Sequence, residues 1–158
     1  MANQSDHFMR MAIELARQGM KAGKGGPFGC VIVKDNIIVG KGSNAVLATN
    51  DPTAHAEVMA IRDACTNLNS FQLDGCEMYT SCEPCPMCLG AIYWARPEKV
   101  YYGATRHDAS DAGFDDSLIY DELQVPGPDK KIPLVQLHIT DAATVFEEWK
   151  SDGTKTLY

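Results

Sequence analysis

The stretch CEMYTSCEPCPMCLGAIYWARPEKVYYGA, residues 76–104, decides the fold class. CEMYTS at its start and KVYYGA at its end are short and bounded like strands, whereas CPMCLGAIYWA between them has the length and the apolar content of a helix. A strand, a helix and a second strand in this order predict a parallel crossover unit, which is right-handed by the usual rule.

The flanking segments continue this alternation. We expect a helix over residues 6–22, two strands in FGCVIVKDNIIVG (28–40) with a turn at Asp35-Asn36, and a helix through HAEVMAIRDAC (55–65), for which Asp51-Pro52 offers an N-cap and a first-turn proline. A strand at PLVQLHI (133–139) and a helix around ATVFEEWK (143–150) follow. The pattern predicts one α/β domain over residues 1–158, with helices on both faces of a single sheet.

Composition restricts the partners. The chain carries a formal charge of −7 and a pI of about 5.0, so a nucleic-acid backbone would be repelled rather than bound. No apolar run approaches the length of a membrane span, and the opening MANQSDHF has no secretory pattern. We therefore expect a cytoplasmic protein with a small-molecule substrate, and with neither a nucleic acid nor a membrane as partner.

The thiols raise three alternatives. Cys82, Cys85 and Cys88 lie within seven residues, and a reducing compartment argues against disulfides among the six cysteines. Cys85-x-x-Cys88 at a helix start favours thiolates, because the unpaired N–H groups and the helix dipole stabilise negative charge there. That geometry suits a redox pair and a metal site equally well.

His55 and Glu57 favour the metal site. They are also expected near a helix start at the carboxyl edge of the sheet, where ligand sites form. His55, Cys85 and Cys88 make three zinc ligands, one fewer than a closed structural site, and leave a position for a water that zinc acidifies. Glu57 can then take the proton of that water. His-x-Glu combined with Pro-Cys-x-x-Cys is the signature of zinc nucleobase deaminases.

Other interpretations remain open at this point. A redox dithiol would give His55 and Glu57 no role, and a structural zinc with Cys82 as fourth ligand would give Glu57 none. We expect Cys82 instead to be a small buried residue in the turn between strand and helix.

Several longer motifs carry a resemblance to a known family. The chain resembles the small bacterial guanine deaminases of the cytidine-deaminase-like superfamily over nearly its whole length. The motifs that carry the likeness are GGPFG (25–29), NDPTAHAE (50–57), SCEPCPMCLGAIYWARP (81–97), AGFDDS (112–117) and the tail that ends at Tyr158. The tRNA adenosine deaminases share the zinc motifs but are typically basic and lack the AGFDD segment.

The resemblance implies a cytidine-deaminase-like three-layer α/β/α sandwich with a five-stranded mixed sheet. It implies hydrolysis of guanine to xanthine and ammonia, in purine catabolism or salvage, with one zinc per chain. The alternatives are guanosine, another aminated heterocycle or cytosine as substrate, and less favourably a tRNA adenosine.

The resemblance also assigns roles to further residues. Asp116 would be a second proton shuttle beside Glu57. Substrate contacts would come from Phe28, Asn44, Ala56, Trp94, Phe114 and Tyr158. In the family the C-terminal segment, here residues 143–158, is exchanged between the subunits of a homodimer, and Tyr158 would then contact the partner's substrate.

Overall fold

A computed structural model describes residues 4–158 of the chain. The chain divides into two compact units, of which the first ends at Asp116 and the second runs from Ser117 to Tyr158. No helix of the described residues is both long and apolar enough to cross a lipid bilayer.

The first unit is built around a four-stranded mixed sheet. The strand order is β2-β1-β3-β4, in which β1 is antiparallel to both β2 and β3, and β3 is parallel to β4. Its elements are α1 (Gln4–Lys21), β1 (Gly29–Lys34), β2 (Ile37–Ser43), α2 (Val46–Thr49), α3 (Ala56–Leu68), β3 (Cys76–Cys82), α4 (Pro86–Ala95), β4 (Lys99–Ala104) and α5 (Arg106–Asp111). The expected crossover is therefore confirmed as β3-α4-β4.

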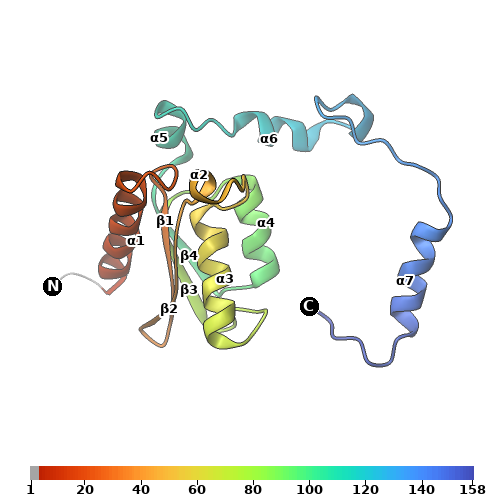
Figure 1. The fold of residues 1–158 in the computed structure, drawn as a ribbon, viewed down its shortest axis with the longest axis horizontal. Helices are drawn as coiled ribbons and strands as arrows, with labels where there is room; N and C mark the ends of the chain where they lie inside the picture. The colour runs from red at the N-terminus through yellow and green to blue at the C-terminus, as the bar shows by residue number, and fades with distance from the viewer. Residues whose placement is uncertain (1–3) are drawn as a thin grey trace. The chain divides into compact units, whose positions relative to one another are not determined.

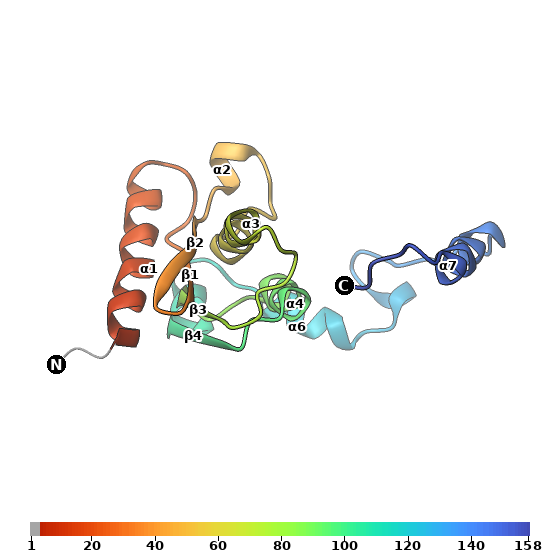
Figure 2. The same cartoon turned by 90° about the horizontal axis from the view of Figure 1, so that it is seen from below.

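Helices cover both faces of this sheet (Figures 1 and 2). α1 packs on one face, where Phe8 and Ala12 meet Val31, Val33 and Tyr79. α3 and α4 pack on the other face, over a core that includes Ile32, Met78 and Ile92. Alternate residues of β1 thus enter opposite cores, as the two-residue period of a strand requires. The predicted three-layer α/β/α arrangement is confirmed.

The hairpin between β1 and β2 follows from two residues. Asp35 and Asn36 have φ angles of 50° and 63°, the left-handed conformation that Asp and Asn tolerate better than most residues. Two successive left-handed residues make the turn whose twist matches that of the paired strands. The turn predicted at Asp35-Asn36 is confirmed.

The second unit contains helices and irregular chain. It comprises α6 (Ser117–Gln124), a short 3-10 helix (Gly127–Asp129) and α7 (Asp141–Ser151), which confirms the helix expected around residues 143–150. The strand expected at 133–139 is wrong, because that segment has no regular structure and its residues are exposed. A strand needs a neighbour for its backbone N–H and C=O groups, and the described part of this unit offers none. The sheet therefore has four strands rather than the expected five.

Helix α3, which begins directly after His55, approaches the sheet through small residues. Ala56, Ala60 and Ala64 recur at four-residue intervals on α3 and are fully buried, opposite Gly40 and Gly42 of β2. A Cβ atom at Gly42 would lie 2.3 Å from the carbonyl oxygen of Ala56 and 2.6 Å from the nitrogen of Ala60. Both of these are helix backbone atoms, so the start of α3 cannot remain in place if Gly42 gains a side chain.

We expect Gly42→Ala to lower the free energy of unfolding by about 2–3 kcal/mol, the upper part of the range for overpacking. It should also weaken metal binding, because the first turn of α3 must move. Gly90→Ala is the matched control. Gly90 is exposed in α4 with nothing within 4 Å of an added Cβ, so alanine should raise stability by about 0.5–1 kcal/mol. Chemical denaturation of both variants measures the difference, and equal stabilities would contradict the close contact.

Candidate active site

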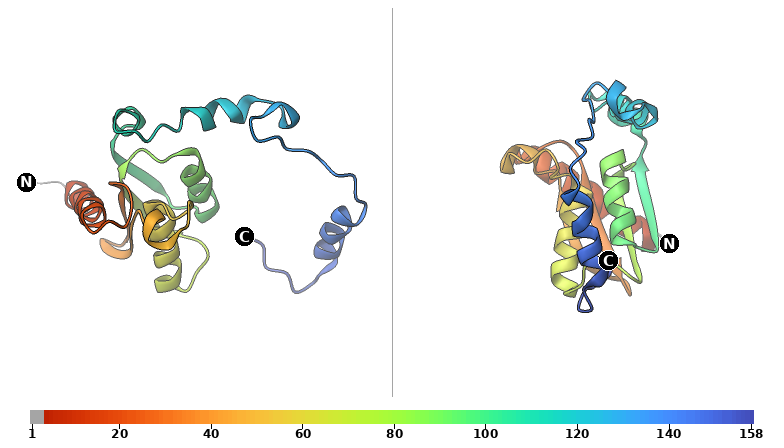
Figure 3. Two further views of the ribbon diagram at one scale, coloured as in Figure 1. Left: turned by 45° about the horizontal axis from the view of Figure 1, so that its top comes forward. Right: turned by 90° about the vertical axis from the view of Figure 1, so that its right-hand side faces the viewer.

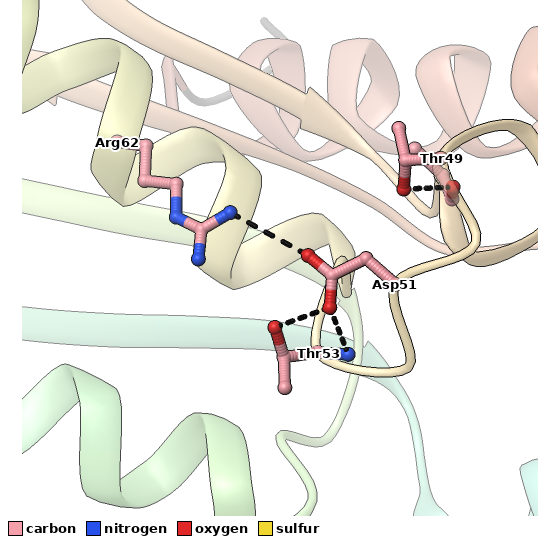
Figure 4. Close-up of polar contacts among 5 residues, drawn as sticks. Thr49, Asp51, Thr53 and Arg62 are labelled. Carbon is pink, nitrogen blue, oxygen red and sulfur yellow. Dashed lines mark hydrogen bonds and ion pairs between the residues drawn. The ribbon is translucent and has the colours of Figure 1, made fainter.

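The turn before α3 places His55 at the N-terminal start of that helix. Asp51 Oδ1 accepts hydrogen bonds from Thr53 N at 2.8 Å and from Thr53 Oγ1 at 2.7 Å, and Asp51 Oδ2 lies 3.8 Å from Arg62 of α3 (Figure 4). The N-cap of α3 is His55, not the predicted Asp51-Pro52. The Asp51 side chain is used within its own turn, and the imidazole of His55 makes no capping bond. The ring is therefore available to bind a ligand.

The other half of the site lies at the start of α4. Cys85 is the N-cap, Pro86 is the first helical residue, and Cys88 N donates to Cys85 Sγ at 3.5 Å. A proline at the first helical position loses no helical hydrogen bond, which is why the chain can begin a helix between the two cysteines. α3 and α4 lie side by side on the same face of the sheet (Figure 3), so the two helix starts meet.

Three ligand atoms converge there. His55 Nδ1 lies 3.5 Å from Cys85 Sγ and 3.4 Å from Cys88 Sγ, and all three atoms are within 4.8 Å of one another. A tetrahedral zinc with bonds of about 2.3 Å to sulfur and 2.0 Å to nitrogen would separate N and S ligands by about 3.5 Å. One imidazole nitrogen and two sulfurs in this arrangement fit zinc, with Nδ1 as the nitrogen ligand.

The protonation of the cysteines suits a metal site. The pKa of Cys85 is lowered to about 4, mainly by hydrogen bonding from Cys88 and further by a hydrogen bond with His55. Cys85 is therefore a thiolate at neutral pH. The same pairing with Cys85, together with burial, raises the pKa of Cys88. The hydrogen bond with Cys85 raises the pKa of His55. Zinc binding would therefore displace a proton from Cys88, as metal ligands require.

Glu57 lies directly beside the ligands. Glu57 is buried, with 6% of its surface exposed, and its Oε2 accepts a hydrogen bond from Cys88 Sγ at 3.4 Å. Burial is the main cause that raises the pKa of this carboxyl group. A carboxylate that is close to a metal but is not needed as a ligand is the group that can accept and return a proton.

Cys82 does not belong to the ligand group. It is buried at the end of β3, and its thiol donates to the carbonyl oxygen of Thr105 at 3.6 Å. Burial raises its pKa to about 11, so it stays protonated. Among residues 4–158 the ligand set has three members, which argues against a closed structural zinc. All six cysteines are free thiols.

Two predicted substrate residues lie deep in the first unit. Asn44 is buried, and its Oδ1 accepts from Gly26 N at 3.3 Å and Val46 N at 3.2 Å. Both bonds use the oxygen, so the NH₂ group is the part of Asn44 that can donate to a ligand. Ala56 is fully buried next to His55, which leaves only its backbone to meet a ligand.

The predicted aromatic contacts differ in position. The rings of Phe28 and Phe114 meet edge to face with centroids 5.0 Å apart, and both line a cavity of about 420 Å³. That cavity is formed mainly by α1, α5 and the ends of β3 and β4, and none of the three metal ligands lines it. Trp94 on α4 is 65% exposed, and Tyr158 belongs to the second unit. A role in substrate binding stays a prediction for all four.

Asp116 ends the first unit. Burial is the main cause that raises the pKa of its carboxyl group, and the charge of Cys85 raises it further. Its role as a second proton carrier stays a prediction.

Sequence reasoning missed one polar residue of the site. Thr80 in the middle of β3 is 1% exposed, and its hydroxyl donates to Glu57 Oε1 at 3.2 Å. Threonine is common in strands, so its position in the sequence carries no signal.

Known proteins show the same organisation. Residues 2–104 match the sequence-family model of the cytidine and deoxycytidylate deaminase zinc-binding region. A guanine deaminase of Bacillus subtilis (strain 168) is 54% identical over 151 residues, which cover 96% of this chain and 97% of that protein. The crystal structure of guanine deaminase from Bacillus subtilis superposes with a TM-score of 0.95 at 54% identity, covering 97% of this chain and 98% of the other.

More distant relatives include both guanine deaminases and tRNA-specific adenosine deaminases. A guanine deaminase structure from Nitrosomonas europaea has a TM-score of 0.67 at 32% identity, covering 73% of this chain and 66% of the other. A tRNA-specific adenosine deaminase of Aquifex aeolicus is 42% identical over 99 residues, 63% of this chain and 65% of that protein. With the three-ligand site and the buried glutamate in place, the chain therefore belongs to the cytidine and deoxycytidylate deaminase family and is a zinc-dependent hydrolytic enzyme.

Proposed function

We propose that this protein deaminates guanine hydrolytically to xanthine and ammonia. The observation that carries the proposal is the buried carboxylate of Glu57 beside a three-ligand zinc set. The substrate is supported by the likeness to the guanine deaminase of Bacillus subtilis, which extends over 96% of the chain at 54% identity, whereas the matches to tRNA-specific adenosine deaminases cover 62–76% of the chain at 35–42% identity.

The reaction exchanges the amino group on C2 of the purine for oxygen. Zinc held by His55, Cys85 and Cys88 would lower the pKa of a bound water toward neutrality. Glu57 takes one proton of the attacking water and delivers it to the ring nitrogen next to C2, while the water oxygen forms a bond to C2, which becomes tetrahedral and carries both a hydroxyl and an amino group. The C2–N bond then breaks, and the amino group leaves as ammonia only after it has received a proton, because an amide anion is too poor a leaving group. That proton comes from the new C2 hydroxyl group: Glu57, a carboxylate again after its first transfer, or Asp116 moves it to the amino nitrogen, and C2 is left as a carbonyl carbon of xanthine.

Recognition of the base would use both backbone and side chains. The Asn44 NH₂ group would donate to a ring acceptor, the Ala56 backbone would lie beside the ring, and Asp116 would accept from the purine edge. Phe28, Phe114 and Trp94 would provide apolar surface for the flat ring.

Ammonia release across a substrate panel tests the function. Guanine should react faster than guanosine, cytosine, cytidine and a tRNA anticodon stem-loop by at least about 100-fold, since a site that hydrogen-bonds one base leaves polar groups unpaired with another. Faster release from the stem-loop, or from guanosine, would overturn the assignment. The charge of −7 already disfavours an RNA substrate.

We further propose that residues 1–158 act as one deaminase domain in a homodimer, with residues 143–158 exchanged between subunits. Val145 and Phe146 of α7 are 60% and 69% exposed, Tyr158 is 69% exposed, and such apolar surface favours a partner. Exchange of an identical element is a low-cost route to a symmetric dimer. A tail that covers the partner's site would exclude water from it and strengthen its electrostatics.

Removal of residues 156–158 should raise KM or lower kcat for guanine while zinc content and thermal unfolding stay nearly unchanged. A mixing experiment distinguishes exchange from action within one chain. The truncated protein retains a complete Glu57 site, and a Glu57→Gln protein retains a complete tail. If the tail acts on the partner, refolding the two together restores activity that neither has alone. Activity equal to the sum of the two separate proteins would contradict exchange.

The thiols favour a cytoplasmic location. All six are free, and two of them must stay reduced to hold zinc, which a reducing compartment ensures.

A further inference from the structure

Thr80 is a polar side chain in a place that normally holds an apolar one. Neighbouring residues of β3 point to opposite faces of the sheet, so Thr80 lies on the same face as Met78. Met78 belongs to the core that α3 and α4 cover. Only 1% of Thr80 is exposed. A buried hydroxyl group without a hydrogen bond costs roughly 1–3 kcal/mol in proteins, so its partner is the reason that it can be tolerated.

That partner is the proposed proton carrier. Thr80 Oγ1 donates to Glu57 Oε1 at 3.2 Å, whereas Glu57 Oε2 lies 3.4 Å from Cys88 Sγ, on the side of the metal ligands. The two oxygens of one carboxylate therefore have different surroundings. Oε1 is hydrogen-bonded to a strand of the sheet through Thr80, and Oε2 faces the metal ligands, where the reacting water would bind.

We propose that Thr80 is a positioning residue, which fixes Glu57 through Oε1 so that Oε2 is the oxygen that carries the proton. The inference rests on the proposed deaminase function and deepens it. Thr80 itself does not touch the substrate. It acts through Glu57.

The mechanical basis is the difference in stiffness between the two residues. The terminal torsion of a glutamate is broad, so an unanchored carboxylate can rotate away from the water. The χ1 angle of a β-branched threonine is restricted, and the backbone of Thr80 pairs with Cys30 on one side and Tyr102 on the other. The hydroxyl is thus a rigid anchor. Misplacement of a reacting group by about 1 Å can cost about 100-fold in rate.

Thr80→Val is the first test, because valine has nearly the same shape but no hydroxyl group. We expect kcat for guanine to fall about 10- to 100-fold, while KM stays within about twofold and zinc content is unchanged. Thr80→Ser restores the hydroxyl and should recover most of the rate. If Thr80 had a purely structural role, Thr80→Val would not lower kcat alone, and Thr80→Ser would not restore it.

Two further variants make the test specific. In a Glu57→Gln background, Thr80→Val should slow the residual turnover no further, because both changes act through one group. Thr66→Val is the matched control. Thr66 lies on α3 and bonds the carbonyl oxygen of Arg62 at 2.9 Å, so its loss should leave kcat unchanged. If valine at position 80 prevents folding, Thr80→Ala carries the same expectation.

The outcomes separate this inference from the function on which it rests. Absence of guanine turnover in the natural chain would refute the proposed function. Normal guanine turnover with a Thr80→Val protein as fast as the natural one, or a Thr80→Ser protein as slow as Thr80→Val, would refute only the role of Thr80. A loss of zinc in proportion to the loss of rate would show that Thr80 supports the metal site instead.

Discussion

A Glu57→Gln protein is expected to keep one zinc per chain and to turn over guanine about 10²- to 10⁴-fold more slowly than the natural chain, the range for loss of a general acid–base group. Glutamine has almost the same size as glutamate, and its amide can still accept a hydrogen bond from Thr80. It cannot take a proton from water and return it to the purine. The loss should therefore appear in kcat, with the metal still in place.

Elemental analysis and steady-state ammonia release on the same preparation measure both quantities. Glu14→Gln is the control, because Glu14 is exposed on α1 and pairs with Arg17 at 2.8 Å, away from the site. It should behave like the natural protein. Near-normal turnover by Glu57→Gln would remove the mechanism proposed here. Loss of zinc together with activity would instead assign Glu57 to the metal coordination.

The elements that the sequence predicts correctly are those whose signals are local. The turn at Asp35-Asn36 depends on two residues that tolerate a left-handed conformation, and the crossover from β3 to β4 depends on short apolar segments around a helix. The convergence of His55 with Cys85 and Cys88 also follows from the sequence, because a known motif supplies the residues and because α3 and α4 follow β2 and β3, two strands that run in the same direction and end at one edge of the sheet.

The errors arise where a local signal has two possible uses. Asp51 can cap a helix or close its own turn, and its bonds to Thr53 show that the turn prevails, so the helix begins at Ala56. Residues 133–139 have the composition of a strand, but only a neighbouring strand can complete the backbone hydrogen bonds. Thr80 was missed because its partner lies 23 residues away on another element. None of these outcomes is encoded in a short window of sequence.

The second large effect is expected at the metal ligands. Cys85→Ser should lower zinc affinity by more than the roughly 10- to 100-fold that follows loss of an outer-shell partner, because a direct bond to the metal is removed. Cys85 is a thiolate at neutral pH, since its pKa is lowered to about 4 mainly by hydrogen bonding from Cys88. A serine hydroxyl does not ionise in this range and is a poor zinc ligand. Activity should fall to background, and competition with a chromophoric chelator measures the affinity directly.

Cys82→Ser is the matched control for this prediction. Cys82 lies three residues earlier in the same stretch, yet its thiol bonds the Thr105 carbonyl oxygen and its pKa is raised to about 11, chiefly by burial. A serine there can keep the bond to the carbonyl, so zinc affinity and kcat should stay close to those of the natural chain. Equal loss of zinc in the Cys82 and Cys85 variants would mean a closed four-ligand structural site, in which Glu57 has no water to activate. Full zinc binding and activity in Cys85→Ser would instead exclude Cys85 as a ligand.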